Sequence, residues 1–360
     1  MAYQGVSDFR SDTVTRPTRS MYEAMMTAPL GDDSLGDDPT VSKLEQMAAD
    51  LLGKEAAMLC ISGTMANQVA IRTHCRPGQE VILEESNHIL NYEMGSAAFA
   101  MVQTRPIVGT NGVMEPCELE RRLRSADGHS PGTGLICLEN THNAAGGVIL
   151  PRDIVLELSG IARRAGIPIH LDGARIFNAQ AASGIPAREL AAPADSVMFC
   201  LSKGLGCPLG SLLCGSRDFI DKARSFRQVM GGGMRQAGII AACGIVALEE
   251  NIERLSEDHK RARRLGEGLS RIPAIEIDIS RVETNMVYFG LKDGCTATLE
   301  DIVENARHRD VLMAQATKLS IRMVCHKDID DNDVGKAIHV IQEFLKHAEN
   351  GRTLSLQIEL

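Results

Sequence analysis

The sequence predicts an α/β protein with a mostly parallel sheet flanked by helices, followed by a smaller α/β domain toward the C-terminus. Between residues 55 and 215, short apolar runs typical of buried strands alternate with loops and with helical apolar spacing, which is the pattern of such a sheet. The chain of 360 residues is also too long for one ordinary compact core. We therefore expect a large domain over residues 1–250, with 1–18 as an N-terminal arm, and a small domain over 251–360.

Each element follows from its local pattern. Apolar runs predict strands at residues 56–61, 81–83, 135–138, 167–171 and 197–201 in the large domain, and at 275–279, 286–289 and 319–324 in the small one. Helical spacing predicts helices at 19–26, 41–52, 154–165, 237–250, 252–269 and 333–348. The aspartate-rich loop before residue 41 supplies a helix cap, and the small residues of 237–250 permit close helix packing.

The composition is that of a globular protein that binds neither nucleic acid nor membrane. The net charge is −9 and no basic stripe stands out. The N-terminal residues contain no apolar signal core, and no apolar run is long enough to span a bilayer. The ten cysteines include no Cys-x-x-Cys pair, and several lie within apolar runs, so neither a zinc site nor a disulfide framework is indicated. We expect a reduced, cytoplasmic protein without a bound metal.

Two ionisable residues follow apolar strand runs. Lys203 comes after the run at 197–201, and Asp172 comes after the run at 167–171. A lone lysine in this setting more often extends to solvent, but the crevice over the carboxyl ends of an α/β sheet suits the two residues together. Their pairing is the chemistry of pyridoxal phosphate (PLP), in which a lysine amine forms a Schiff base and an aspartate keeps the pyridine nitrogen protonated.

Two further stretches are candidates for the same site. Ser62, Gly63 and Thr64 stand between a strand and a helix, where unpaired amides favour a phosphate, although an ordinary helix cap looks similar. His88 follows the strand at 81–83 and could stack on a flat cofactor or lie on the surface, and spacing alone leaves these alternatives even.

Seven motifs in order resemble the low-specificity L-threonine aldolase family. They are 8–15 (DFRSDTVT), 62–68 (SGTMANQ), 139–143 (ENTHN), 170–175 (HLDGAR), 200–204 (CLSKG), 231–236 (GGGMRQ) and 321–328 (IRMVCHKD). The resemblance implies the aspartate-aminotransferase fold (fold type I), a PLP cofactor, and a homodimer or homotetramer with active sites at subunit interfaces.

The resemblance also implies roles for matching residues. Lys203 would form the Schiff base, and Asp172 would partner the pyridine nitrogen. The substrate α-carboxylate would be bound by Ser11, Arg175 and Arg322, of which Arg175 also counts as a cofactor contact. Phosphate binding is implied for Gly63, Thr64 and Arg235 (the last from a neighbouring subunit), and ring stacking for His88. His129 matches a second histidine near the substrate hydroxyl and Tyr92 falls in the active-site region, although both could be loop residues without such a role.

The expected reaction is retro-aldol cleavage of a β-hydroxy-α-amino acid, such as threonine or allo-threonine, to glycine and an aldehyde. His88 or His129 would remove the β-hydroxyl proton, directly or through a water. One departure bears on this reaction, because Leu35 stands where the family usually carries a tyrosine.

The alternative is an alanine racemase of the kind found in fungal peptide pathways, which resembles the same family and breaks Cα–H. Lys203 would serve one face of the cofactor, and His88 or Tyr92 the other. Leu35 is compatible with this reaction, since alanine has no β-hydroxyl group. A β-eliminating lyase is a weaker third alternative. A non-catalytic scaffold is disfavoured because both the lysine and the aspartate are present.

Overall fold

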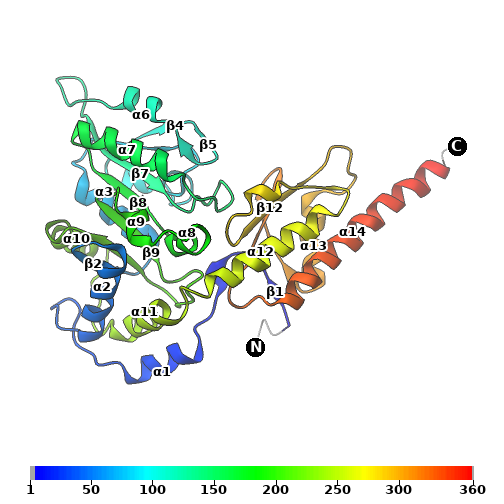
Figure 1. Cartoon of the computed structure of the whole chain (residues 1–360), viewed down its shortest axis with the longest axis horizontal. Helices are drawn as coiled ribbons and strands as arrows, with labels where there is room; N and C mark the ends of the chain where they lie inside the picture. Colours follow the sequence, from blue (N-terminus) through cyan, green and yellow to red (C-terminus); the bar gives the residue numbers. More distant parts are fainter. Residues whose placement is uncertain (1–4, 359–360) are drawn as a thin grey trace. The chain divides into compact units, whose positions relative to one another are not determined.

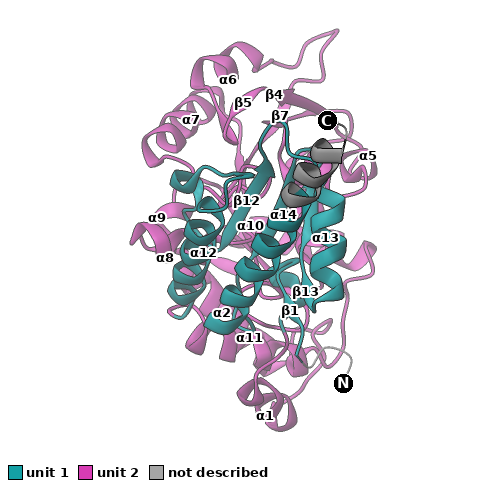
Figure 2. Cartoon of the chain, turned by 90° about the vertical axis from the view of Figure 1, so that its right-hand side faces the viewer, with its two compact units in different colours: residues 1–15, 254–360 teal, residues 16–253 magenta. Residues whose placement is uncertain are grey.

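The structure of the protein, a computed structural model, describes residues 5–358, with side chains described through residue 348. The chain divides into two compact units: residues 16–253 form one, and the residues before 16 group with those from 254 onward to form the other (Figure 2). The division after Glu253 falls close to the expected boundary at 250. Residues 5–15, however, group with the C-terminal unit, whereas an arm over residues 1–18 was expected in the large domain.

A seven-stranded sheet forms the centre of the unit 16–253 (Figure 1). In spatial order its strands are β2 (Ala56–Cys60), β10 (Ser211–Gly215), β9 (Ser196–Cys200), β8 (Ile169–Asp172), β7 (Thr133–Glu139), β3 (Glu80–Glu84) and β4 (Gln103–Ile107). β10 runs antiparallel to both of its neighbours, and the remaining pairs are parallel. A mixed, mostly parallel sheet was predicted, and this fold class is confirmed.

Helices cover both faces of this sheet. The helices of the unit are α1 (Arg19–Thr27), α2 (Pro39–Leu52), α3 (Gly63–His74), α4 (His88–Asn91), α5 (Ser96–Phe99), α6 (Pro116–Arg122), α7 (Arg152–Ala165), α8 (Ile176–Ser183), α9 (Ala187–Ala191), α10 (Arg217–Val229) and α11 (Gly238–Glu250). A short hairpin joins β5 (Gly109–Thr110) to β6 (Val113–Met114). Apolar side chains of α3 and α10 pack against β2, β9 and β10. On the other face, α7 and α9 approach Leu138 of β7 and Leu171 of β8.

Local sequence explains where α2 begins and ends. Pro39 occupies its first turn, and the Asp38 side chain accepts hydrogen bonds from the amides of Thr40 and Val41. The helix ends at Gly53, whose φ of +62° is the left-handed conformation that glycine adopts without strain.

The second unit has a four-stranded antiparallel sheet in the order β11 (Ile275–Glu276), β12 (Met286–Leu291), β15 (Ser320–Val324) and β14 (Ala314–Thr317). Its helices are α12 (Leu255–Ser270), α13 (Leu299–His308), α14 (Asp331–Ile358) and two 3-10 turns, η1 (Asp12–Val14) and η2 (Ile279–Arg281). β1 (Ser7–Asp8) pairs in parallel with β13 (Val311–Leu312), and Phe9 is fully buried in the core of this unit. These contacts are the reason that the N-terminal segment belongs here. Over the described residues, none of the helices combines the length and the apolar character that a membrane crossing requires.

Candidate active site

The loops after the parallel strands β3, β7, β8 and β9 all leave the same edge of the central sheet. This geometry follows from parallel pairing, because the carboxyl ends of such strands lie together (Figure 1). His88, Asp172 and Lys203 each occupy or follow one of these ends. The structure therefore brings three of the predicted site residues to one edge of one unit.

Asp172 is the last residue of β8 and is 2% exposed. Its Oδ1 accepts a hydrogen bond from the amide of Ala174 at 3.1 Å, and its Oδ2 accepts one from Asn67 Nδ2 of α3 at 2.9 Å. These donors hold the carboxylate at a fixed angle on the face of the sheet covered by α3. Both donors are neutral groups.

His88 begins the short helix α4, which Asn87 caps by accepting a bond from the amide of Ile89. The amide of His88 donates to Glu139 Oε2 at 2.7 Å, and its ring Nδ1 lies 3.2 Å from Glu93 Oε1. Burial lowers the pKa of this ring, but the hydrogen bond to Glu93 and the nearby carboxylates outweigh burial, so the pKa is raised. The positive charge of Lys203 acts in the opposite direction.

Lys203 lies in the loop between β9 and β10 and is half-buried. Its carbonyl accepts a bond from the amide of Gly206 at 2.9 Å, and Gly206 adopts φ of +82°, which closes the loop tightly. A second bond, from the amide of Cys207 to the carbonyl of Leu201, anchors the turn to the end of β9. The loop is thus held at both ends.

The N-terminus of α3 is close to this edge. Ser62 caps the helix through a bond from the amide of Met65, which leaves the half-buried Gly63 and the exposed Thr64 at the first turn. A Cβ at Gly63 would lie 2.9 Å from Cys200 Sγ, so glycine lets the helix start approach β9. This geometry suits an anion at the helix end.

Comparison with known proteins assigns the chain to a family. The model of the beta-eliminating lyase family matches residues 8–292. The chain belongs to this family. It is 42% identical over 352 residues to low-specificity L-threonine aldolase 1 of Arabidopsis thaliana, covering 96% of this chain and 98% of that protein. It is also 42% identical to the low specificity L-threonine aldolase of Escherichia coli, in an alignment that covers 94% of this chain and 99% of that protein. The solved structure of Leishmania major threonine aldolase superposes on this structure with a TM-score of 0.80 at 18% sequence identity. The superposition covers 94% of this chain and 99% of that chain. The resemblance stated from the motifs is confirmed.

Within this lyase, the remaining predicted residues lie in several places. Arg175, which is 6% exposed, precedes α8, and its Nη1 lies 3.5 Å from Asn143 Oδ1 in the loop after β7. Arg235 is exposed and pairs with Asp32 at 3.3 Å. The glycine-rich loop before Arg235 packs against α3, since a Cβ at Gly232 would lie 2.6 Å from the sulfur of Met65.

Ser11 and Arg322 belong to the other unit of the lyase, where the structure brings them together. Ser11 caps η1 by accepting a bond from the amide of Thr13. Arg322 lies on β15, and its Nη2 donates to the carbonyl of Arg10 at 3.2 Å, one residue before Ser11. Nearby, Arg10 forms an ion pair with Asp8 at 2.6 Å.

His129 and Tyr92 differ from the other site residues in exposure or position. His129 is exposed and lies in the loop before β7, whose two ends are joined by hydrogen bonds between Arg124 and Thr133. Because this loop precedes β7, His129 lies toward the amino ends of the parallel strands. His88 lies at the opposite, carboxyl edge, so the structure does not bring the two histidines together within one chain. Tyr92 is 53% exposed, and its ring centroid lies 5.5 Å from that of His88.

Leu35, the departure from the family pattern, is 77% exposed and lines a cavity of about 760 Å³. Arg235 lines the same cavity, and two bonds join their loops: Asp33 amide to Arg235 carbonyl, and Ser34 Oγ to Met234 carbonyl. Leu35 and Arg235 therefore lie on two loops that hydrogen bonds hold together.

Sequence reasoning missed three residues that the site uses. Asn67 lies one helical turn after Gly63 in α3, Glu93 lies between α4 and α5, and Glu139 ends β7; each is at most 4% exposed. Glu139 accepts bonds from the amides of His88 and Asn143 and so joins two loops of the site. Asn67 and Glu139 lie within motifs recognised in the sequence. Glu93 has no comparable signal, because its neighbours become evident only after folding.

His88, Glu93 and Asp172 offer ligand atoms that lie within 4.8 Å of one another, a spacing that could hold a metal ion. The amide hydrogens of Asn67 already reach both Glu93 and Asp172, at 2.8 and 2.9 Å. These hydrogens supply the positive potential between the two carboxylates, and we assign the group no metal.

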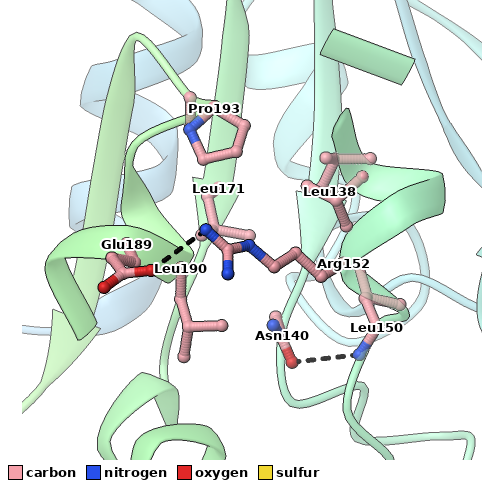
Figure 3. A pocket seen from close by; sticks show the side chains of 10 residues that line it. Leu138, Asn140, Leu150, Arg152, Leu171, Glu189, Leu190 and Pro193 are labelled. Atoms are coloured by element: carbon pink, nitrogen blue, oxygen red, sulfur yellow. Dashed lines mark hydrogen bonds and ion pairs between the residues drawn. The ribbon is translucent and has the colours of Figure 1, made fainter. Parts of the chain in front are cut away.

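A second, smaller pocket lies on the α7 face of the sheet (Figure 3). Arg152 and Glu189 form an ion pair across it at 3.0 Å, and Asn140 Oδ1 accepts a bond from the amide of Leu150. Its volume of about 20 Å³ has room for about one water molecule, so it is too small for an amino-acid substrate.

Proposed function

We propose that this protein is a PLP-dependent lyase that cleaves the Cα–Cβ bond of a β-hydroxy-α-amino acid such as threonine, giving glycine and an aldehyde. The observation that carries the proposal is the buried carboxylate of Asp172 at the sheet edge where His88 and Lys203 also lie. The relatives that are 42% identical over nearly the whole chain are named low-specificity L-threonine aldolases, which supports the same reaction.

The donor set at this edge fits PLP. Lys203 offers a primary amine for the cofactor aldehyde, and Asp172 offers a buried carboxylate for the pyridine nitrogen. The amides of Gly63 and Thr64 offer hydrogen bonds to a phosphate at the start of α3, and Arg235 is the further candidate for the phosphate. When bound, PLP would supply a ring that accepts the electron pair released as the Cα–Cβ bond breaks.

His88 is the proposed base. Its Nδ1 faces Glu93, so Nε2 is the nitrogen available to take the β-hydroxyl proton. Glu93 then stabilises the positive charge that develops on the ring, as the orienting carboxylate does in other base–carboxylate pairs. Arg175, fixed beside Asn143, is the proposed ligand of the substrate carboxylate within this unit.

The roles assigned to Ser11, Arg322, Tyr92 and His129 stay predictions. So do the homodimer or homotetramer and the cytoplasmic location.

The test is Lys203→Ala. This variant should bind PLP without the near-ultraviolet to visible absorbance of the covalent form and should release no acetaldehyde from threonine. The matched control is Lys222→Ala, which removes an exposed lysine of α10 and should leave both measurements unchanged. Aldehyde release by Lys203→Ala at the wild-type rate would reject the proposed function.

Alanine racemisation is the second candidate, and the observation that favours it is Leu35. An exposed leucine beside Arg235 presents no hydroxyl where the family usually has a tyrosine. Incubating the holoenzyme with L-alanine in deuterated water, and resolving the product on a chiral column, distinguishes the reactions. D-alanine with deuterium at Cα indicates a racemase, whereas unchanged alanine together with aldehyde release from threonine indicates an aldolase.

A further inference from the structure

Behind Asp172 lies a buried chain of hydrogen bonds that the proposed mechanism does not use. His74 Nε2 lies 2.8 Å from Ser196 Oγ, and Ser196 Oγ lies 2.9 Å from His170 Nδ1. His170 Nε2 in turn lies 3.0 Å from Asn67 Oδ1. The chain therefore runs without interruption from the end of α3, across β9 and β8, and back to the first half of α3.

The secondary structure brings these side chains to one face of the sheet. His170 and Asp172 are two residues apart on β8 and so point the same way, and Ser196 pairs with His170 on the neighbouring strand β9. Asn67 and His74 are seven residues apart, or about two turns of α3, so both face the sheet.

Asn67 connects this chain to the two carboxylates of the site. Its Nδ2 lies 2.8 Å from Glu93 Oε1 and 2.9 Å from Asp172 Oδ2, and the residue is 1% exposed. An ionised carboxylate only accepts hydrogen bonds, so both hydrogens of the amide group are donated, one to each carboxylate. The amide oxygen must then face His170.

This orientation fixes the position of every proton along the chain. Since Asn67 Oδ1 accepts, His170 Nε2 must carry a hydrogen. Burial lowers the pKa of His170 to about 3, although the charge of Asp172 and a main-chain contact with Ser196 act in the opposite direction, so the ring is neutral. With Nε2 protonated, its Nδ1 accepts from the hydroxyl of Ser196 at 2.9 Å. The Ser196 oxygen then accepts from His74 Nε2; burial lowers the pKa of that ring to about 4, and it stacks on Phe219 at 4.5 Å.

We propose that Asn67 is a positioning residue: its amide, locked in one orientation by the chain through His170, Ser196 and His74, stands between the carboxylates of Asp172 and Glu93 and holds both in place. An amide without such a chain could turn by 180° and present its oxygen to the carboxylates, which would repel them. The role of Asn67 itself does not depend on the proposed function. Only its consequence rests on that function: Asp172 would be positioned to bind a pyridine nitrogen, and Glu93 to orient His88.

The first test replaces the amide by an apolar group of similar size, Asn67→Leu. Without the shared donor, the two carboxylates repel each other, and one of them takes up a proton. The other charged groups that act on this cluster include His88, Glu139, His142 and Lys203, and they are unchanged in the variant. Infrared difference spectra of the apo proteins at neutral pH should show the carbonyl stretch of a protonated carboxyl group in the variant and not in the wild type. PLP affinity measured by equilibrium dialysis should fall on the order of tenfold, and by less at higher pH, where the proton is lost again.

The matched control is Ser159→Ala. Ser159 is a buried serine of α7 whose hydroxyl donates to the carbonyl of Pro193, outside the chain. Ser196→Ala removes a buried hydroxyl inside the chain and should weaken PLP binding, whereas Ser159→Ala should not. Equal effects of the two serine variants would overturn the role of the chain. For Asn67→Leu, unchanged affinity would overturn the proposal, and so would a loss of affinity without the carboxyl band.

The second test needs no substitution that could impair folding. In ¹⁵N-labelled apo wild-type protein, long-range proton–nitrogen correlation should show His170 as a neutral ring protonated on Nε2 from about pH 6 to about pH 8. A ring protonated on Nδ1, or on both nitrogens, would overturn the proposal. If wild-type protein did not bind PLP at all, the proposed function would fail, but the infrared and tautomer measurements would still decide the role of Asn67.

Discussion

Replacing Glu139 by glutamine should loosen the loop that carries His88 or the loop that carries Asn143. Glu139 is 4% exposed, and its two oxygens accept from these two amides at 2.7 and 2.8 Å. Glutamine keeps one accepting oxygen but turns an NH₂ group toward the other amide, so one bond is lost. A hydrogen bond to a charged group contributes about 2 kcal/mol, which corresponds to about 30-fold in the local opening equilibrium.

Amide hydrogen exchange followed by mass spectrometry measures this opening directly. In Glu139→Gln, peptides covering residues 85–91 or 140–146 should exchange about 30-fold faster than in the wild type. Peptides from β12 of the other unit serve as the internal control. The control variant is Glu189→Gln, which loses only an exposed ion pair with Arg152, worth less than about 1 kcal/mol. Unchanged exchange in both peptides would show that Glu139 does not hold the loops.

Two further predictions concern stability. The pKa of His88 is raised in the folded protein, so the stabilisation from its pair with Glu93 is fully present below the ordinary histidine pKa of about 6.5 and is lost as pH rises through the folded value. Calorimetric melting temperatures should therefore fall less with rising pH in Glu93→Gln than in the wild type, and parallel curves would contradict the assignment. Gly112→Ala should destabilise by about 1–3 kcal/mol more than Gly78→Ala, since both glycines have positive φ but only at Gly112 would the new Cβ meet the buried ring of His142. Equal melting temperatures of the two variants would show that the ring moves aside.

The central sheet and much of the site could be predicted because the signals are local. The apolar runs at 56–61, 81–83, 135–138 and 197–201 all became strands, since each is apolar on both faces and both faces are covered by helices. The polar residues that end parallel strands must gather at one edge, so the position of Lys203 at this edge could be predicted without coordinates.

Features that depend on tertiary contacts could not be predicted from the sequence. The edge strand β4 contains Pro106 and polar residues, a pattern that resembles a loop and that is tolerated in a strand only at an edge. The N-terminal arm carries no indication of which unit it joins, because that depends on β1 meeting β13. Asn67 resembles an ordinary helix residue until its bonds to two carboxylates are known.

The way in which the buried acids are satisfied explains why this edge favours a positively charged ring. Asp172 accepts hydrogen bonds from two neutral donors, the Asn67 side chain and the amide of Ala174, whereas Glu93 and Glu139 contact the His88 and His142 rings in addition to neutral amide donors. Neutral donors offset the cost of burying a carboxylate but leave its negative charge in place, unlike a tight ion pair. The remaining negative potential raises the pKa of His88 in spite of burial. A protonated pyridine nitrogen at Asp172 would experience the same potential, so the chemistry that makes His88 basic is also the chemistry that would hold an electron-accepting cofactor in its charged form.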